Sequence, residues 1–198
     1  WAVRQRRNYP IVLVLALLAA VDLLNLLGVL LQHDAWQRQG SHAAIWLVAA
    51  MMTLIGGRVI PFFTQRGLGR LEMVQPWAWL DLALLVGTLL LALLTGAGLL
   101  LQPHWGGAVL LLGLGLGHGI RLQRWFDRGL LRVPLLWSLH LAYAWMVLAC
   151  LGLALWHAGV AVPFSQALHA LTVGAMAGLI LAMLARVSLG HTGRPLEV

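Results

Sequence analysis

Six long apolar stretches dominate the chain, and short polar segments separate them. The hydrocarbon core of a bilayer is about 30 Å thick, so a helix needs roughly 20 predominantly apolar residues to cross it. Each stretch approaches or exceeds this length, and the gaps carry Gly, Pro, Gln and Arg, which favour turns and surfaces. The pattern therefore predicts an all-α, polytopic transmembrane helix bundle with six spans, at about 10–31, 43–60, 77–101, 106–122, 134–156 and 163–186.

The first stretch follows basic residues, as the core of a signal peptide does. It is longer than a typical signal core and contains Asp22 and Asn25, so we predict that it is retained as a span. Residues 1–198 are then predicted to form a single six-helix transmembrane domain.

Arginine distribution predicts the orientation of these spans. The chain has 13 cationic side chains, all of them arginine. If the N-terminus lies in the cytoplasm, only Arg38 falls in an outer loop, and the other arginines fall on the cytoplasmic side. Cytoplasmic loops of membrane proteins carry an excess of basic residues, so both termini are predicted to be cytoplasmic.

Composition supports a membrane protein over a soluble one. Hydrophobic residues make up 61% of the chain and charged residues 10%, too few to cover the surface of a soluble domain. The net charge of +7 is not a sign of nucleic-acid binding, because the arginines lie in short gaps between apolar runs. The predicted partner is the lipid bilayer. Cys150, the single cysteine, lies in an apolar run and is expected to be a core residue.

Two histidines and one aspartate are predicted to share a layer near the cytoplasmic side. Ionisable groups inside a bilayer are costly unless they are paired or ligated, so each one is a functional candidate. His118 lies about 6 Å and His140 about 10 Å from the cytoplasmic edge, on consecutive antiparallel spans. We therefore expect these two imidazoles to face one another, with Asp81 in the same layer.

His169 enters the membrane from the other side, at a depth of about 9 Å. Neutral imidazole binds haem iron and copper, and bundle interiors hold such sites. The structural alternative is a hydrogen bond from each histidine to a neighbouring helix. We interpret His140 and His169 as candidate metal ligands at separate centres, with His118 as the next candidate. The remaining histidines near the outer edges are expected to be interfacial side chains, with access to water: His33, His42, His104 and His157.

The arginines divide into two groups. One group recurs every three or four residues and is interpreted as a solvated, lipid-facing basic stripe: Arg121, Arg124, Arg128 and Arg132. In the other group, Arg58 and Arg186 lie closer to the apolar segments. A buried arginine needs an anion, for which a carboxylate or phosphate is suited, and haem propionates would serve.

Small residues predict where helices approach closely. Ala170, Gly174, Gly178 and Ala182 form a ridge at four-residue spacing in the last span, and Gly113 and Gly117 do the same in the fourth. Such ridges let helix backbones come together in lipid.

The residues assign no catalytic group. The chain has no phosphate-binding loop, no pair of cysteines and no acidic dyad within a span. Ser138 lies two residues before His140, a spacing that does not bring two side chains together on a helix. Whether the protein is an enzyme is therefore left open by the residues.

Three segments together carry a resemblance to a known family. They read GRVIPFFT at 57–64, HLAYAW at 140–145 and HALTVGAMAGLILAMLARVSLGHTGRP at 169–195. The third segment, with its opening histidine, spaced glycines and final Gly-His-Thr-Gly-Arg, resembles the C-terminal signature of the NnrS family.

NnrS-family proteins are polytopic membrane proteins of about twelve spans that contain haem and copper. They are associated with bacterial denitrification and with defence against nitric oxide. The resemblance implies an inner-membrane protein with haem and copper as cofactors and nitric oxide, or a related small molecule, as partner. It also implies that this chain is the C-terminal half of a longer protein whose N-terminal six spans would be a further partner.

Within that resemblance, the metal ligands are expected to be His140, His169 and His118. An inner-face polar cluster is expected to hold propionates, or to shape a path to the site, and it consists of Arg58, Arg186, His191 and Arg194. Two alternatives remain open. The chain resembles in size one half of a secondary transporter, which would use the same intramembrane polar residues. It is also compatible with a non-catalytic membrane partner of another complex.

Overall fold

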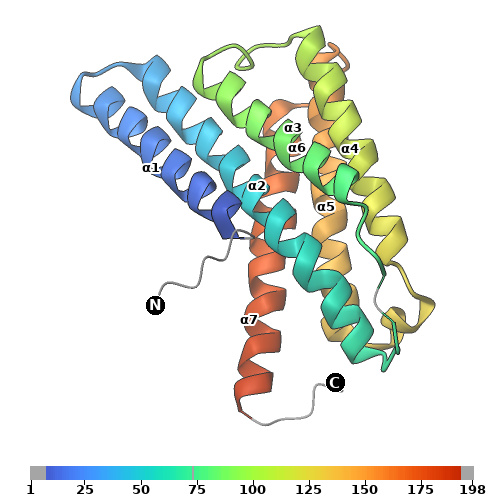
Figure 1. The fold of residues 1–198 in the computed structure, drawn as a ribbon. Helices are drawn as coiled ribbons and strands as arrows, with labels where there is room; N and C mark the ends of the chain where they lie inside the picture. Colours follow the sequence, from blue (N-terminus) through green and yellow to red (C-terminus); the bar gives the residue numbers. More distant parts are fainter. Residues whose placement is uncertain (1–7, 73, 193–198) are drawn as a thin grey trace.

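The computed structural model describes residues 8–72 and 74–192, the side chain of His191 excepted. The regular secondary structure of this part of the chain is helical, and these residues contain no strand. Six of its helices are long and apolar enough to cross a membrane, as predicted. The elements, coloured along the chain in Figure 1, are α1 (Tyr9–Leu30), α2 (Asp34–Gly67), α3 (Ala78–Gly96), α4 (Trp105–Trp125), η2 (Arg128–Arg132), α5 (Pro134–His157), α6 (Phe164–His169), η3 (Ala170–Ala177) and α7 (Gly178–His191).

The second helix departs most from its predicted bounds. It begins at Asp34 instead of residue 43, because its polar first turns pack closely against α1. A Cβ at Gly28 would lie 2.7 Å from the backbone nitrogen of Gln37, and one at Gly40 would lie 2.7 Å from the carbonyl oxygen of Val21. The helix also continues through Pro61 to Gly67. The polar residues predicted to form a loop are therefore the start of a long helix.

The helices pack mostly on their neighbours in sequence. As Figure 1 shows, α1 lies along α2 at the edge of the bundle, while α3 and α4 lie on the other side of α2. The helix α5 packs against α4 and against the last span, which consists of α6, η3 and α7. This arrangement makes α2 and α5 the central helices.

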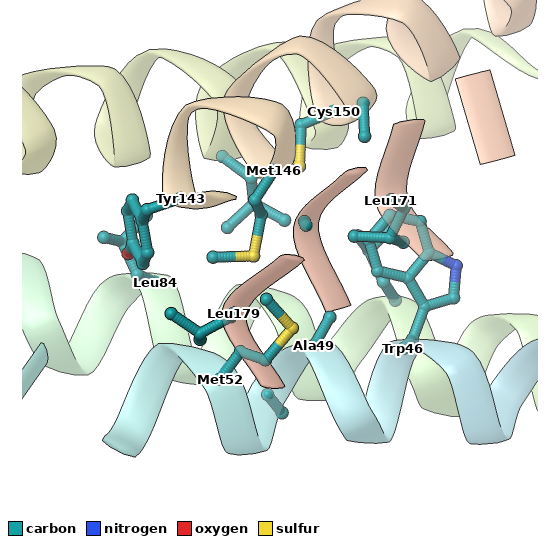
Figure 2. Close-up of a cluster of buried hydrophobic side chains, with 14 of the residues drawn as sticks. Trp46, Ala49, Met52, Leu84, Tyr143, Met146, Cys150, Leu171 and Leu179 are labelled. Carbon is teal, nitrogen blue, oxygen red and sulfur yellow. The ribbon is translucent and has the colours of Figure 1, made fainter. Parts of the chain in front are cut away.

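The core lies between α2, α5 and the last span. Figure 2 shows Trp46, Ala49 and Met52 of α2 on one side of this core. The opposite side carries side chains of α5, and residues of the last span lie between the two. Cys150 is 2% exposed within the same cluster, which confirms the prediction that it is a core residue.

The small-residue ridge of the last span approaches a neighbouring helix closely, as predicted, and this helix is α5. A Cβ at Gly174 would lie 2.6 Å from the Trp145 ring, and one at Gly178 would lie 3.3 Å from the Ala142 Cβ. Gly174 belongs to η3, a π-helical segment of 8 residues that follows His169. On α4 the prediction is wrong for Gly113, where a Cβ would meet nothing within 4 Å.

Candidate functional site

Arg121 occupies the interior of the bundle, so its assignment to a lipid-facing stripe is wrong. The residue is 4% exposed, and its Nη2 lies 2.8 Å from Asp81 Oδ1 in an ion pair between α4 and α3. A guanidinium inside a bundle requires such a partner, because the cost of removing an unpaired charge from water is several kcal/mol. The counter-charge explains why this arginine turns inward.

Further contacts fix the Arg121 guanidinium between four helices. Its Nη1 donates to the carbonyl oxygen of Thr53 on α2, at 3.0 Å, and to the Tyr143 hydroxyl on α5, at 3.2 Å. Its carbon Cζ lies 4.9 Å from the centre of the Trp125 ring. Gly57 leaves room for the group, since a Cβ there would collide with the guanidinium nitrogens. Within the described residues, the buried Nε of Arg121 has no hydrogen-bond partner.

The Tyr143 hydroxyl connects Arg121 to His118. His118 Nδ1 lies 2.7 Å from this hydroxyl, and His118 is 1% exposed. Arginine donates hydrogen bonds but accepts none, so Tyr143 accepts from Arg121 and has its own O–H to donate. The acceptor in reach is His118 Nδ1, which assigns the proton of the neutral imidazole to Nε2. A metal role for His118 through Nδ1 would therefore require Tyr143 to give up this hydrogen bond.

A cavity of about 370 Å³ lies beside this network, between α2, α3 and α4. Arg121 and Asp81 line it, together with Arg58 and Arg124. Arg124 stacks on Trp77, with Cζ 3.9 Å from the ring centre, and its Nη2 donates to the Gln75 carbonyl oxygen at 2.7 Å. Arg58 Nη1 donates to the Asn8 side chain at 3.4 Å. The cavity is thus lined by three guanidinium groups and one carboxylate, and we refer to it as the arginine cavity.

His140 lies in different surroundings. It is 7% exposed and lines an apolar groove of about 490 Å³ between α4, η2 and α5, here called the His140 groove. Its Nδ1 lies 3.0 Å from the Leu136 carbonyl oxygen, which accepts a hydrogen bond from an Nδ1–H. Its Nε2 faces the Trp125 carbonyl oxygen at 3.4 Å, a longer contact than that of Nδ1. The shorter Nδ1 contact favours the tautomer with its proton on Nδ1, and a ligand at Nε2 would have to replace the Trp125 contact.

The expected pairing of His118 with His140 is not formed. Among the described residues, no hydrogen bond or ring contact joins the two imidazoles. His118 contacts Tyr143, whereas His140 approaches α4 at Trp125, seven residues or about 10 Å beyond His118. Helix rise predicts the depth of each histidine along the membrane normal, but it does not predict the side of the helix to which the imidazole points.

His169 is exposed at the end of α6. Its Nδ1 lies 2.6 Å from the Ser165 carbonyl oxygen, the same i to i−4 contact that His140 makes. Within the described residues, no group of three or more His, Cys, Asp or Glu side chains could hold a metal ion. The described residues therefore place none of the candidate ligands in a group of three or more possible metal ligands.

Two residues of the predicted inner-face cluster, Arg58 and Arg186, lie in different places. Arg186 is 6% exposed, with its Cζ 4.1 Å from the Phe63 ring centre, while Arg58 lines the arginine cavity. Arg194 lies outside the described residues, and for His191 only the backbone at the end of α7 is described. The structure thus places Arg58 and Arg186 in separate surroundings.

His157 at the other end of α5 is not the water-accessible side chain we expected. It is 6% exposed, and its Nδ1 accepts a hydrogen bond from the His104 backbone N–H at 3.1 Å. Its ring also packs against Gly107, where a Cβ would lie 2.8 Å from Nδ1. This histidine joins α5 to the start of α4.

A second ion pair lies outside the spans. Arg70 Nε and Nη2 each donate to an Asp127 carboxylate oxygen at 2.9 Å, which links the end of α2 to the α4–η2 connection. The hydrogen bonds from Arg70 and from the Gly129 N–H lower the pKa of Asp127, and the same contact raises the pKa of Arg70. This pair could not be predicted from the sequence, since its two members lie near the surface and 57 residues apart.

Comparison with known proteins places the chain in a family. A family model described as NnrS protein matches residues 1–198. Neither the curated proteins nor the solved structures gave a match to the chain. Because the family model covers the full sequence, this six-span helical protein belongs to the NnrS family.

Proposed function

We propose that this protein binds haem in the bacterial inner membrane and acts in the response to nitric oxide and in denitrification. Family membership and the six candidate spans support this proposal. Nitric oxide is small and apolar, so it can reach an intramembrane site through lipid without a polar channel. The proposed orientation places both termini in the cytoplasm, as the arginine distribution predicts.

His140 carries the haem proposal. A planar, largely apolar macrocycle requires an apolar surface and an imidazole whose free nitrogen faces it. The His140 groove offers such a surface, with Phe126, Leu131 and Trp137 among its lining residues. The hydrogen bond from Nδ1–H to the Leu136 carbonyl oxygen would hold the ring, and iron bound at Nε2 would replace the 3.4 Å contact with the Trp125 carbonyl oxygen. When bound, haem would supply the iron at which nitric oxide binds.

His169 is proposed as a ligand to a separate copper centre. Its Nδ1 contact with the Ser165 carbonyl oxygen would leave Nε2 for a metal, but a copper site needs more than one ligand. We propose that the others come from outside the described residues, including the N-terminal six-span half. For the propionates we propose Arg186, because its described contact is an aromatic ring and no described carboxylate pairs with it.

Haem content of purified variants tests the role of His140. His140→Ala should reduce the haem bound per protein to a small fraction of the wild-type value. His42→Ala is the matched control, because His42 Nδ1 makes the same contact to an i−4 carbonyl oxygen, at 2.7 Å, but does not line the groove. Equal haem content in both variants would show that the ligand lies elsewhere.

One observation favours a second function. The Asp81–Arg121 ion pair lines the arginine cavity, and transporters place such pairs along substrate paths. The chain would then be one half of a secondary transporter. An optical spectrum separates the two functions, since only the haem protein has a Soret band.

A further inference from the structure

Asp22 is an exposed carboxylate within a transmembrane helix. It belongs to α1, a helix of 22 residues, and lies about 4 Å from the midpoint of that helix. Within the described residues, its side chain has no hydrogen bond and no ion pair. An ionisable side chain at such a depth is costly in lipid and almost always faces a partner or a water-filled cavity. Asp22 lines neither the arginine cavity nor the His140 groove.

No described side chain neutralises Asp22. Asn25, three residues further on α1, accepts a hydrogen bond from the Ser41 hydroxyl on α2, at 3.4 Å, and is thus directed toward that helix. Arg38, near the start of α2, is exposed and makes no ion pair with Asp22. The described part of the chain therefore leaves this carboxylate without a counter-charge.

The face of α1 that carries Asp22 is uncovered. As Figure 1 shows, α1 lies at the edge of the bundle, and it packs mainly against α2. Beside that contact runs a row of residues that are all exposed and that alternate at spacings of three and four: Val12, Leu15, Ala19, Asp22, Leu26 and Val29. Side chains at this spacing line up for contact with a second helix. Lipid can cover the apolar members of this row, here called the α1 seam, but it offers no partner to the carboxylate.

The charge of Asp22 indicates the chemistry of the occupant. A carboxylate accepts hydrogen bonds and donates none, so its partner must supply donors, and a basic side chain would also neutralise it. The described arginines of a second copy of this chain lie toward the ends of its spans. Arg58, for example, donates to Asn8 at the start of α1. Arg38 lies beside the contact of α2 with Gly28, which is about 9 Å beyond Asp22 along α1.

We propose that the α1 seam docks a transmembrane helix that is not part of this six-span bundle and that carries an arginine or lysine at the level of Asp22. The basic side chain pairs with Asp22, while apolar side chains of the partner pack against Leu15 and Leu26. Ala19 has a small side chain, which lets the two helix backbones approach closely. This interface lies outside the His140 groove and does not depend on haem binding.

Binding of a synthetic membrane helix to the full chain tests this proposal. The probe is a leucine–alanine helix of about 22 residues with an arginine at its centre, and the matched peptide has a glutamine there. Energy transfer is measured in phosphatidylcholine nanodiscs, from a dye on Leu71→Cys, an exposed position, to a dye on the peptide. The wild type should bind the arginine peptide at least about tenfold more tightly than the glutamine peptide, because arginine alone neutralises Asp22.

Two aspartate variants make the test specific. Asp22→Asn should abolish the preference for the arginine peptide, whereas Asp34→Asn, at an exposed aspartate that begins α2, should keep it. Equal binding of the two peptides by the wild type, or the same result for the two variants, would overturn the proposal.

Two further measurements exclude other partners for Asp22. Asp22→Leu should leave the chain at least as stable to unfolding as the wild type, because Asp22 makes no described contact. A loss of stability would place the partner of Asp22 within the chain and contradict the proposal. Energy transfer between two labelled copies, without peptide, should not depend on Asp22. If it disappears in Asp22→Asn, the occupant is a second copy and the proposed basic helix is wrong.

Discussion

Gly57→Ala is expected to destabilise the protein by displacing a buried cation. The added Cβ would collide with the Arg121 guanidinium, which must then move away from α2. The displacement breaks the contact with Asp81 and the hydrogen bonds to Thr53 and Tyr143. It leaves charged and polar groups without partners inside the bundle.

The size of the effect follows from these contacts. Disrupting a buried ion pair typically costs about 3–5 kcal/mol, and the lower end applies here because the Asp81 side chain is 33% exposed. Replacing a mid-helix glycine by alanine returns about 1 kcal/mol of helix propensity. The net destabilisation should therefore be about 2–3 kcal/mol.

The assay is reversible unfolding in mixed micelles of neutral detergent and increasing SDS, followed by circular dichroism. Gly56→Ala is the matched control on the same helix, because its Cβ would lie at an ordinary contact distance of 3.5 Å from the Tyr143 ring. This control should be as stable as the wild type or slightly more stable. If Gly57→Ala proves no less stable than Gly56→Ala, the placement of Arg121 against α2 is wrong.

Two further predictions concern the loops. The pKa of Asp127 is lowered in the folded protein, so the Arg70–Asp127 pair stabilises the fold at pH values above the ordinary carboxyl pKa of about 4. This stabilisation is lost as the pH falls through the pKa of Asp127 in the folded protein. Asp127→Asn should therefore flatten this small acid-dependent loss in thermal unfolding curves, and an unchanged pH profile would speak against the pair. For topology, Gln102→Cys should react with an impermeant maleimide from the periplasm, whereas Leu71→Cys, at a position 98% exposed, should react only after permeabilisation. Buried Cys150 should contribute little background, and the reverse labelling pattern would invert the proposed orientation.

The number of spans could be predicted from the sequence because a bilayer demands long apolar runs. Their bounds were predicted less well. The start of α2 at Asp34 depends on the close contacts of Gly28 with Gln37 and of Gly40 with Val21, which hold the polar start of α2 against α1. The hydropathy of a segment does not predict such contacts between helices.

The candidate site shows the same limit. Placing Asp81 and His118 in one layer needed only the rise of a helix, and both belong to the Arg121 network. Arg121 points inward because of the orientation of α4 about its own axis. The spacing of the basic residues alone does not predict this orientation. A usable signal was present nonetheless: Arg121 lies three residues after His118, on the same helix face.

His140 and His169 could be chosen from sequence only as polar groups within apolar runs. The structure adds that one lines an apolar groove and the other is exposed. Neither property follows from depth along the membrane normal, because both depend on how neighbouring helices rotate and cross. Their roles as metal ligands remain proposals that rest on chemistry and family resemblance.

The optical spectrum of the purified wild-type protein, recorded before and after nitric oxide is added to the reduced sample, tests the central claim most directly. The proposed function predicts a Soret band in the protein as isolated and a shift of that band on addition of nitric oxide. It further predicts that His140→Ala lacks most of the band. A protein that is folded by circular dichroism but shows no Soret band, even after expression with excess haem, would contradict the account.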